Sequence, residues 1–363
     1  MSEALKATVY FGEGDRHGGA LVSDGLAGLA ERRGLRVAVL LRGAEGFGLT
    51  QVVRTQRLLT MSENTPLVWT AIDRPEPLRA ALDEVVELAG AGGLVTLERA
   101  RLGARPADLS LRGDGACKLT LYPGRRARAG DRPAVPALVD LLRDAGMEGA
   151  SALLGLDGTL GGERHRARFF SRNAGVPLMV IAAGSAEATG RAIERLDALE
   201  RPPPCTLERI RVLKRDGVPI DRPRLVPEAD VQGLGFWQKV MVHSRQRDRS
   251  GGRPLHLELV RRLRRAGASG ATVLRGAWGY RGADPPAGDG LVALGHRGPL
   301  VTVLVDRPAA TRRWWPALDE VTARAGLVTG EIVPAFRATA PGAVVGGLRL
   351  AAAEGIAEWP GPA

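Results

Sequence analysis

The chain opens with residues 5–11, in which apolar odd positions alternate with more polar even positions. An alternation with a period of two is typical of a half-buried β-strand. Leucine and alanine then recur at helical spacing from Leu21 to Ala30, until Arg33-Gly34 supplies a cation and a stop. The pattern continues with strands predicted over residues 37–48, 66–72 and 94–98 and a helix with an apolar face from Leu78 to Leu88. The predicted order is strand, helix, strand, strand, helix, strand.

The same succession of patterns occurs three times in the chain. A short run rich in β-branched residues and leucine ends at Gly43, at Gly155 and at Gly276, with intervals of 112 and 121 residues. We predict repeat 1 over residues 1–103, repeat 2 over 117–213 and repeat 3 over 234–336. A linker over 104–116, a proline-rich linker over 214–233 and a tail over 337–363 separate and follow them.

Each repeat predicts an α+β domain of the ferredoxin-like type, with the order βαββαβ. An open four-stranded sheet that is covered by helices on one face must cover its other face as well. We therefore expect the three domains to pack around a pseudo-threefold axis, as a pseudo-trimer within one chain. Repeat 2 is the degenerate copy, because Leu154 stands where the other repeats have Arg42 and Arg275.

Composition limits the classes of partner. The chain has 363 residues, 44% of them hydrophobic, and a net charge of +11, but only four of its 51 basic residues are lysines. No block of basic residues with interleaved aromatic residues is present, and aromatic residues make up only 4% of the chain. We interpret the charge as a solvated arginine-rich surface, so nucleic acid is an unlikely partner.

The cysteines and histidines indicate no metal site. Cys117 and Cys205 lack C-x-x-C spacing, and the five histidines are scattered without pairing. The two cysteines should also be too far apart for a disulfide, because they begin antiparallel strands that are staggered. The amino terminus lacks the apolar core of a signal peptide, and the longest apolar run, residues 176–183, is far shorter than a membrane span. We expect a cytoplasmic protein without membrane insertion.

Four short motifs carry a resemblance to a known family. They are Lys-x-Thr-x-Tyr in the first strand, Asp-Arg-x-Gly-Gly at residues 15–19 and 248–252, Arg-Gly-x-x-Gly followed by an aromatic residue, and Leu-Val-Thr-Leu-Glu at residues 94–98. Together they resemble the PII-like family called domain of unknown function 190, in three tandem copies. Proteins of the wider PII-like group are ferredoxin-like trimers that bind small ligands, often nucleotides, between subunits and report occupancy through the loop after the second strand. The resemblance implies this architecture and a signalling function, but it names no ligand.

The Arg-Gly-x-x-Gly elements are candidate ligand-binding sites. An arginine beside glycines at a strand end can hold a phosphate or carboxylate by two hydrogen bonds while the backbone approaches closely. The alternative is a solvated arginine beside a structural turn. The candidate residues are Arg42, Gly43 and Gly46 in repeat 1 and Arg275, Gly276 and Gly279 in repeat 3.

Three of the four lysines, Lys6, Lys118 and Lys239, occupy the same position in the three first strands. In a chain whose other cations are almost all arginines, this recurrence suggests a need for an ammonium group there. The alternation of the strand places the lysines on the face away from the helices, where they would add positive potential to a ligand site. An unselected cation at a strand edge is the alternative.

Other glycine and charged positions have simpler explanations. The segment from Gly12 to Gly14 is better explained as a tight turn than as a phosphate-binding loop. Asp15 and Asp248 are expected to cap the helices that follow them.

We therefore predict a small-ligand sensing protein that binds a nucleotide or another anion between repeats, orders the following loop, and acts on an unidentified protein target. No particular cofactor is indicated. The alternative is an enzyme acting on a small anionic substrate in the same cleft, although no hydrolase or metalloprotease motif is present. RNA binding lacks its stacked-aromatic signature.

Overall fold

The computed structural model describes residues 2–48, 51–55, 64–103, 115–167, 175–221, 226–288, 298–340 and 342–352. Within them, the long elements follow the predicted order three times. Repeat 1 contains β1 (Ser2–Gly12), α1 (Val22–Arg32), β4 (Val37–Phe47), β6 (Pro66–Asp73), α2 (Pro75–Ala89) and β7 (Leu94–Gly103). Repeat 2 contains β8 (Ala116–Leu121), α3 (Ala134–Asp144), β11 (Gly149–Leu160), β13 (Leu178–Ser185), α4 (Ala186–Asp197) and β14 (Cys205–Arg215). Repeat 3 contains β16 (Trp237–Arg245), α5 (Leu255–Arg265), β19 (Ala271–Arg281), β21 (Pro299–Asp306), α6 (Pro308–Val321) and β22 (Leu327–Val333).

Short strands are added at two places in each repeat. Before the first helix lie the pairs β2 (Arg16–His17) with β3 (Ala20–Leu21), β9 (Arg128–Ala129) with β10 (Arg132–Pro133), and β17 (Arg249–Ser250) with β18 (Arg253–Pro254). After the second long strand, β5 (Arg54–Thr55), β12 (Glu163–Arg166) and β20 (Ala287–Gly288) pair back onto it.

The expected helix caps are wrong. Asp15 accepts a hydrogen bond from the Gly12 backbone N–H at 2.7 Å, and Asp248 accepts one from the Arg245 N–H at 2.8 Å. The residue at the start of α1, Leu21, makes no side-chain cap hydrogen bond. The two aspartates therefore hold the turn that leads into the short strand pair.

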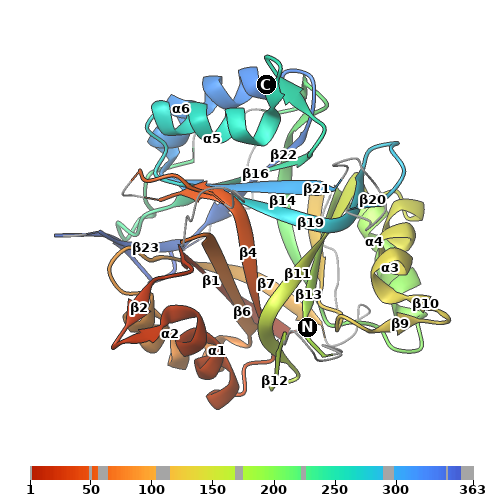
Figure 1. The fold of residues 1–363 in the computed structure, drawn as a ribbon, viewed down its shortest axis with the longest axis horizontal. Helices are drawn as coiled ribbons and strands as arrows, with labels where there is room; N and C mark the ends of the chain where they lie inside the picture. The colour runs from red at the N-terminus through yellow and green to blue at the C-terminus, as the bar shows by residue number, and fades with distance from the viewer. Residues whose placement is uncertain are drawn as a thin grey trace.

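The long strands of the three repeats form one continuous antiparallel sheet that closes on itself as a β-barrel. One closed circuit of hydrogen-bonded neighbours runs β1-β6-β4-β11-β13-β8-β14-β7 and returns to β1. Repeat 3 joins the same sheet, because β19 pairs with both β4 and β11 and β22 pairs with β14. Figure 1 shows the helix pairs α1/α2, α3/α4 and α5/α6 on the outside, with the strands between them.

The prediction of three ferredoxin-like α+β domains forming a pseudo-trimer is therefore wrong. The protein is mostly strand, and the long strands of the three repeats share one large sheet instead of forming a separate four-stranded sheet in each repeat. The physical reason lies in the long strands: β4 pairs with β6 only as far as Arg42, and its remaining residues pair with β19 of repeat 3. A strand edge without a partner leaves backbone N–H and C=O groups unpaired. The long strands of each repeat therefore form backbone hydrogen bonds with strands of the other repeats.

The hydrophobic core has four large parts. Three clusters lie mainly within one repeat each and include the fully buried Trp69, Leu119 and Trp314. A fourth cluster mixes residues from all three repeats, such as Met179 and Met241. Successive side chains of a strand point to opposite faces of the sheet. The first three clusters therefore contain side chains from one face of the sheet, and the fourth cluster contains side chains from the other face. The repeats therefore share a core as well as a sheet.

The predicted linkers and tail are partly structured. Residues 214–219 include the end of β14 and β15 (Val218–Pro219), and β23 (Ala335–Ala340) and β24 (Ala343–Gly347) extend into the predicted tail. β23 pairs with β7 of repeat 1. Residues 104–114 and 222–225 of the linkers, 353–363 of the tail, and 49–50 and 56–63 of the loop after β4 lie outside the described residues.

Two further expectations can be compared with the structure. Cys117 and Cys205 form no disulfide with each other, as predicted, and both are buried. Among the described residues, no helix combines the length and the hydropathy that a membrane crossing requires.

Candidate functional site

Lys6, Lys118 and Lys239 lie together inside the barrel, and each contacts two glutamates of the last strands. Cations and anions alternate in a closed ring that runs Lys6–Glu98–Lys239–Glu331–Lys118–Glu208 and returns to Lys6. The nitrogen–oxygen distances along it are 2.9, 2.5, 3.0, 2.5 and 3.2 Å, and the Lys6–Glu208 contact closes it. Every side chain of the ring is at most 8% exposed. In each repeat the lysine and the glutamate are direct cross-strand neighbours.

Burial disfavours the charged form of each group in this ring, whereas the neighbouring opposite charges favour it. Burial alone would lower the pKa of Lys6, but Glu208, Glu98 and Glu331 outweigh it and raise that pKa well above its usual value. In the same way, Lys239 and Lys6 overcome burial and hold the pKa of Glu98 well below its usual value. For Lys118, burial prevails and lowers the pKa.

The ring fits an internal ion-pair network better than a metal or anion site. One carboxylate oxygen from each glutamate lies within 4.8 Å of the others, a spacing that a metal ion could use. Each carboxylate, however, already contacts two ammonium groups, which supply the positive charge. The glutamates and Lys239 also line a cavity of about 1520 Å³. Because the ring holds three lysines and three glutamates, its net charge is close to zero and it does not attract an anion.

Arg42 and Arg275 are exposed at equivalent points of β4 and β19. The two strands pair as far as Gly43 and Leu274, the residues that adjoin these arginines, so the register brings Arg42 and Arg275 to neighbouring positions of the sheet. Arg42 forms an ion pair with Glu13. No side-chain partner of Arg275 occurs among the described residues, and burial together with the Arg275 charge lowers the pKa of His256 to about 4. At the equivalent position of repeat 2, Leu154 is 41% exposed.

The glycines of these elements lie where strands of different repeats cross. A Cβ atom on Gly46 would lie 2.6 Å from the carbonyl oxygen of Ala271 in repeat 3, and one on Gly279 would lie 2.2 Å from that of Ala150 in repeat 2. Cβ atoms on Gly43 and Gly276 would lie 2.8 and 2.6 Å from the rings of Pro66 and Pro299. The glycines therefore permit close approach of backbones, and a role in ligand binding stays a prediction.

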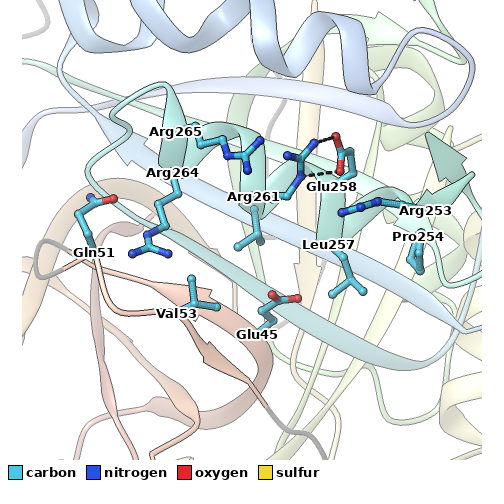
Figure 2. A pocket seen from close by; sticks show the side chains of 11 residues that line it. Glu45, Gln51, Val53, Arg253, Pro254, Leu257, Glu258, Arg261, Arg264 and Arg265 are labelled. Atoms are coloured by element: carbon cyan, nitrogen blue, oxygen red, sulfur yellow. Dashed lines mark hydrogen bonds and ion pairs between the residues drawn. The ribbon is translucent and has the colours of Figure 1, made fainter. Parts of the chain in front are cut away.

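A cavity of about 650 Å³ lies at the junction between repeats 1 and 3 (Figure 2). Residues of α5 and the preceding β18 form one side, and Glu45 of β4 with the segment that follows β4 forms the other. In that segment, Gln51 has a φ of +57°, which is uncommon for a residue with a Cβ atom. The Gln51 side chain donates a hydrogen bond to the Ala268 carbonyl of repeat 3 at 2.9 Å. The segment after β4 is therefore docked across the junction.

The cavity presents guanidinium groups that no described residue engages. Arg261 and Arg262 donate to Glu258 at 2.8 and 2.7 Å through their Nε atoms and hold its pKa well below the usual value. Arg253, Arg264 and Arg265 are exposed, and among the described residues none of their side chains has a hydrogen-bond or ion-pair partner. A planar guanidinium can bind a phosphate or a carboxylate through two parallel hydrogen bonds. This side of the cavity can therefore bind a small anion.

The other two junctions have the same backbone arrangement. At each junction, the same position of the second long strand pairs with a residue of another repeat. In repeat 1 this position is Glu45, which pairs with Val273. In repeat 2 it is Asp157, which pairs with Leu40, and in repeat 3 it is Trp278, which pairs with Ala152. The side chains at this position differ in charge and size, so the three junctions differ in chemistry.

Ion pairs fill the junction between repeats 2 and 1. Arg164 donates two hydrogen bonds to Asp157, at 3.1 and 2.7 Å, and lies 3.4 Å from Glu31 of α1. Arg166 lies 3.2 Å from Asp24 of the same helix. The cations and anions of this junction therefore neutralise one another.

Aromatic side chains fill the junction between repeats 3 and 2. Tyr280 belongs to the core of repeat 2 and donates to the Met147 carbonyl at 2.9 Å, and Trp278 packs against the same core. At the junction between repeats 1 and 3, by contrast, arginines that have no partner among the described residues line a cavity.

The model of the domain of unknown function 190 family, described as "Uncharacterized ACR", matches residues 4–102, 116–212 and 237–335. The chain belongs to this family. Its three tandem copies confirm the repeats predicted from the sequence. The UPF0166 protein of Aquifex aeolicus (strain VF5) is 33% identical over 69 residues, which cover 19% of this chain and 64% of that protein, less than two thirds of its length. A crystal structure of aspartate kinase from Synechocystis aligns over 95% of this chain and 45% of its own with 12% identity, but its TM-score of 0.25 is too low to support an argument.

Sequence reasoning missed two groups of residues in this family member. The ring glutamates recur at one position of the last strand in every repeat, as the lysines do in the first strand, and this paired recurrence was a usable signal. The arginines of α5 offered no such signal, because basic residues are common throughout the chain.

Proposed function

We propose that this protein is a PII-like sensor of a small anionic ligand, which binds at the junction between repeats 1 and 3 and is reported to a protein target through the segment after β4. One observation carries the proposal: Gln51 of that segment lines the arginine-rich cavity and also binds the Ala268 carbonyl of repeat 3. A ligand in the cavity would contact both the segment and the helix that the segment is docked on. Occupancy and the position of the segment are therefore coupled.

The chemistry and the size of the cavity support the same proposal. Three guanidinium groups without described partners supply charge-assisted donors, and Leu257 and Val260 supply apolar contact. A volume of about 650 Å³ suits a small molecule. The net charge of +11 attracts anions to the whole surface, so a test must separate this cavity from general attraction.

Isothermal titration with inorganic pyrophosphate tests the site. Wild-type protein and the double variant Arg264→Ala/Arg265→Ala are compared with Arg195→Ala, which removes an exposed arginine of α4 far from the cavity. We expect the double variant to bind at least roughly tenfold more weakly, the effect of losing a charge-assisted bond, and Arg195→Ala to bind as wild type. Equal weakening by Arg195→Ala, or no effect of the double variant, would place binding elsewhere.

The reporting step has its own test. Amide hydrogen exchange of residues 51–55 should slow when pyrophosphate is bound, because the ligand adds contacts on both sides of the docked segment. Gln51→Ala should retain most of the affinity and lose this protection. If amide exchange of residues 51–55 does not change in wild-type protein saturated with pyrophosphate, the cavity binds the ligand but the segment does not report it.

A further inference from the structure

The arginines of the cavity between repeats 1 and 3 that have no described partner lie at the two ends of α5. Arg253 lies in β18, directly before the helix, and Arg264 and Arg265 are its last two residues. The 11 residues of α5 span about 16 Å, at a rise of about 1.5 Å per residue. Figure 2 shows Arg253 and Arg264 at opposite ends of the cavity. The available guanidinium groups therefore form two separate sets.

The part of the cavity between these two sets is largely apolar. Leu257 and Val260 line it from α5, and Val53 lines it from the segment after β4. Arg261 lines the same part, but it donates two hydrogen bonds to Glu258, so the two charges neutralise each other. A ligand in this cavity therefore meets donors for an acidic group at either end and apolar side chains in between.

The other repeats show which chemical group binds arginines at these positions. Arg132 lies in β10, directly before α3, in the place of Arg253, and it contacts the Asp140 carboxylate at 2.5 Å. Arg32 is the last residue of α1, in the place of the last arginine of α5, and it forms an ion pair with Glu84 of α2. A carboxylate of the protein thus occupies each of these positions. In the part of repeat 3 that the structure describes, neither end of the helix has such a carboxylate at its free arginines, so both ends can accept an acidic group of a ligand.

We infer that the ligand of this junction is a bis-acid: a small molecule with two acidic groups, phosphate or carboxylate, at the ends of an apolar spacer. This inference rests on the proposed function and names the class of ligand. One acidic group engages the arginines of one end, because the length of the helix separates the two sets. Two linked groups engage both ends, and the second contact is then intramolecular, which increases the affinity beyond that of either group alone.

Phosphonate probes isolate the two features of such a ligand. The tightest binder among hexane-1,6-, octane-1,8- and decane-1,10-diphosphonate is compared with two simpler probes. The alkylphosphonate of the same chain length lacks the second acidic group, and methylenediphosphonate lacks the spacer. In isothermal titration, wild-type protein should bind the long diphosphonate at least about tenfold more tightly than either simpler probe, the effect of an added charge-assisted contact.

Variants of Arg253 test the second end of the site. Arg253→Ala should weaken the long diphosphonate to the affinity of the alkylphosphonate and leave the binding of methylenediphosphonate and pyrophosphate unchanged. Arg253→Lys keeps the charge and should retain most of the preference for the long probe. Arg195→Ala, the control in α4, should bind all probes as wild type.

Circular dichroism and the thermal midpoint show that each variant folds, which is expected because the Arg253 side chain is exposed. Equal affinity of wild-type protein for the long diphosphonate and the simpler probes overturns the inference, as does a long-diphosphonate affinity that Arg253→Ala does not change. In either outcome, pyrophosphate binding that depends on Arg264 and Arg265 still supports the proposed function. Failure of every probe to bind, pyrophosphate included, counts against both.

Discussion

The Lys239 ammonium donates to the Glu98 carboxylate at 2.5 Å, although 141 residues separate the two along the chain. Lys239 lies in β16, the first long strand of repeat 3, and Glu98 lies in the last long strand of repeat 1. The contacts of Lys6 with Glu208 and of Lys118 with Glu331 join the remaining pairs of repeats in the same way. Each glutamate therefore links two repeats, and the charges are stable inside the barrel only while all three repeats are in place.

Replacing Glu98 by Gln should destabilise the protein strongly. The substitution keeps the side-chain size but leaves Lys6 and Lys239 with one carboxylate partner fewer each. Breaking a buried ion pair by removing one partner costs about 3–5 kcal/mol. Urea unfolding followed by circular dichroism measures the loss in the free energy of unfolding.

The control is Asp140→Asn, which breaks the exposed pair of Arg132 with Asp140, whose side chains are 59% and 37% exposed. An exposed pair contributes about 0–1 kcal/mol, so this variant should unfold almost as wild type. The double variant Glu98→Gln/Lys239→Met should lose less than the sum of its single variants. A loss for Glu98→Gln as small as that of Asp140→Asn would show that the ring does not hold the repeats.

Adding one methyl group at a strand crossing should also destabilise the barrel. In Gly46→Ala the new Cβ would lie 2.6 Å from the Ala271 carbonyl oxygen, so one of the two backbones must shift. Overpacking of this kind typically costs about 1–3 kcal/mol. Gly48→Ala is the matched control two residues away, because nothing lies within 4 Å of its Cβ position. Thermal midpoints that fall equally for both variants would contradict the packing explanation.

Stability should decrease as the pH falls from about 6.5 to 4. Burial, with smaller effects from Lys118 and Arg281, lowers the pKa of His243 to about 4. Between these pH values the unfolded chain binds a proton at this histidine and the folded protein does not, so the free energy of unfolding falls with decreasing pH. One group contributes at most about 1.4 kcal/mol per pH unit.

Urea unfolding of wild type and His243→Gln at pH 7 and pH 5 measures this contribution. The variant should show a smaller loss between the two pH values, even if it is less stable at both. Parallel curves for wild type and His243→Gln would assign the pH dependence to other groups, of which His256 is the first to examine.

Ligand titration should give one binding site per chain. The three junctions share a backbone arrangement, but Asp157 with Arg164 occupies one and Trp278 with Tyr280 occupies another. A stoichiometry of one for inorganic pyrophosphate, with binding lost or strongly weakened in Arg264→Ala/Arg265→Ala, is the expected result of calorimetry. Three equivalent sites would mean that the side chains at the other two junctions move aside.

The sequence by itself determined the repeats and the local structure within them. Period-two alternation over residues 5–11 and the leucine spacing in α1 and α2 depend on neighbours in the chain, so they can be read without coordinates. The recurrence of Lys6, Lys118 and Lys239 likewise marked a constrained position. It did not identify the partners, because each lysine contacts one glutamate of its own repeat and one of another.

Only the tertiary structure decided how the repeats combine and where a ligand can bind. The hydrophobic pattern specifies which face of a strand is buried, but it does not specify which strand edge meets the free half of β4, and that edge belongs to β19. The closed barrel therefore could not be inferred from the repeats. The contact between Gln51 and Ala268 spans 217 positions. The cavity beside this contact is lined by side chains from segments that are distant in the sequence. No single segment of the chain therefore predicts the cavity.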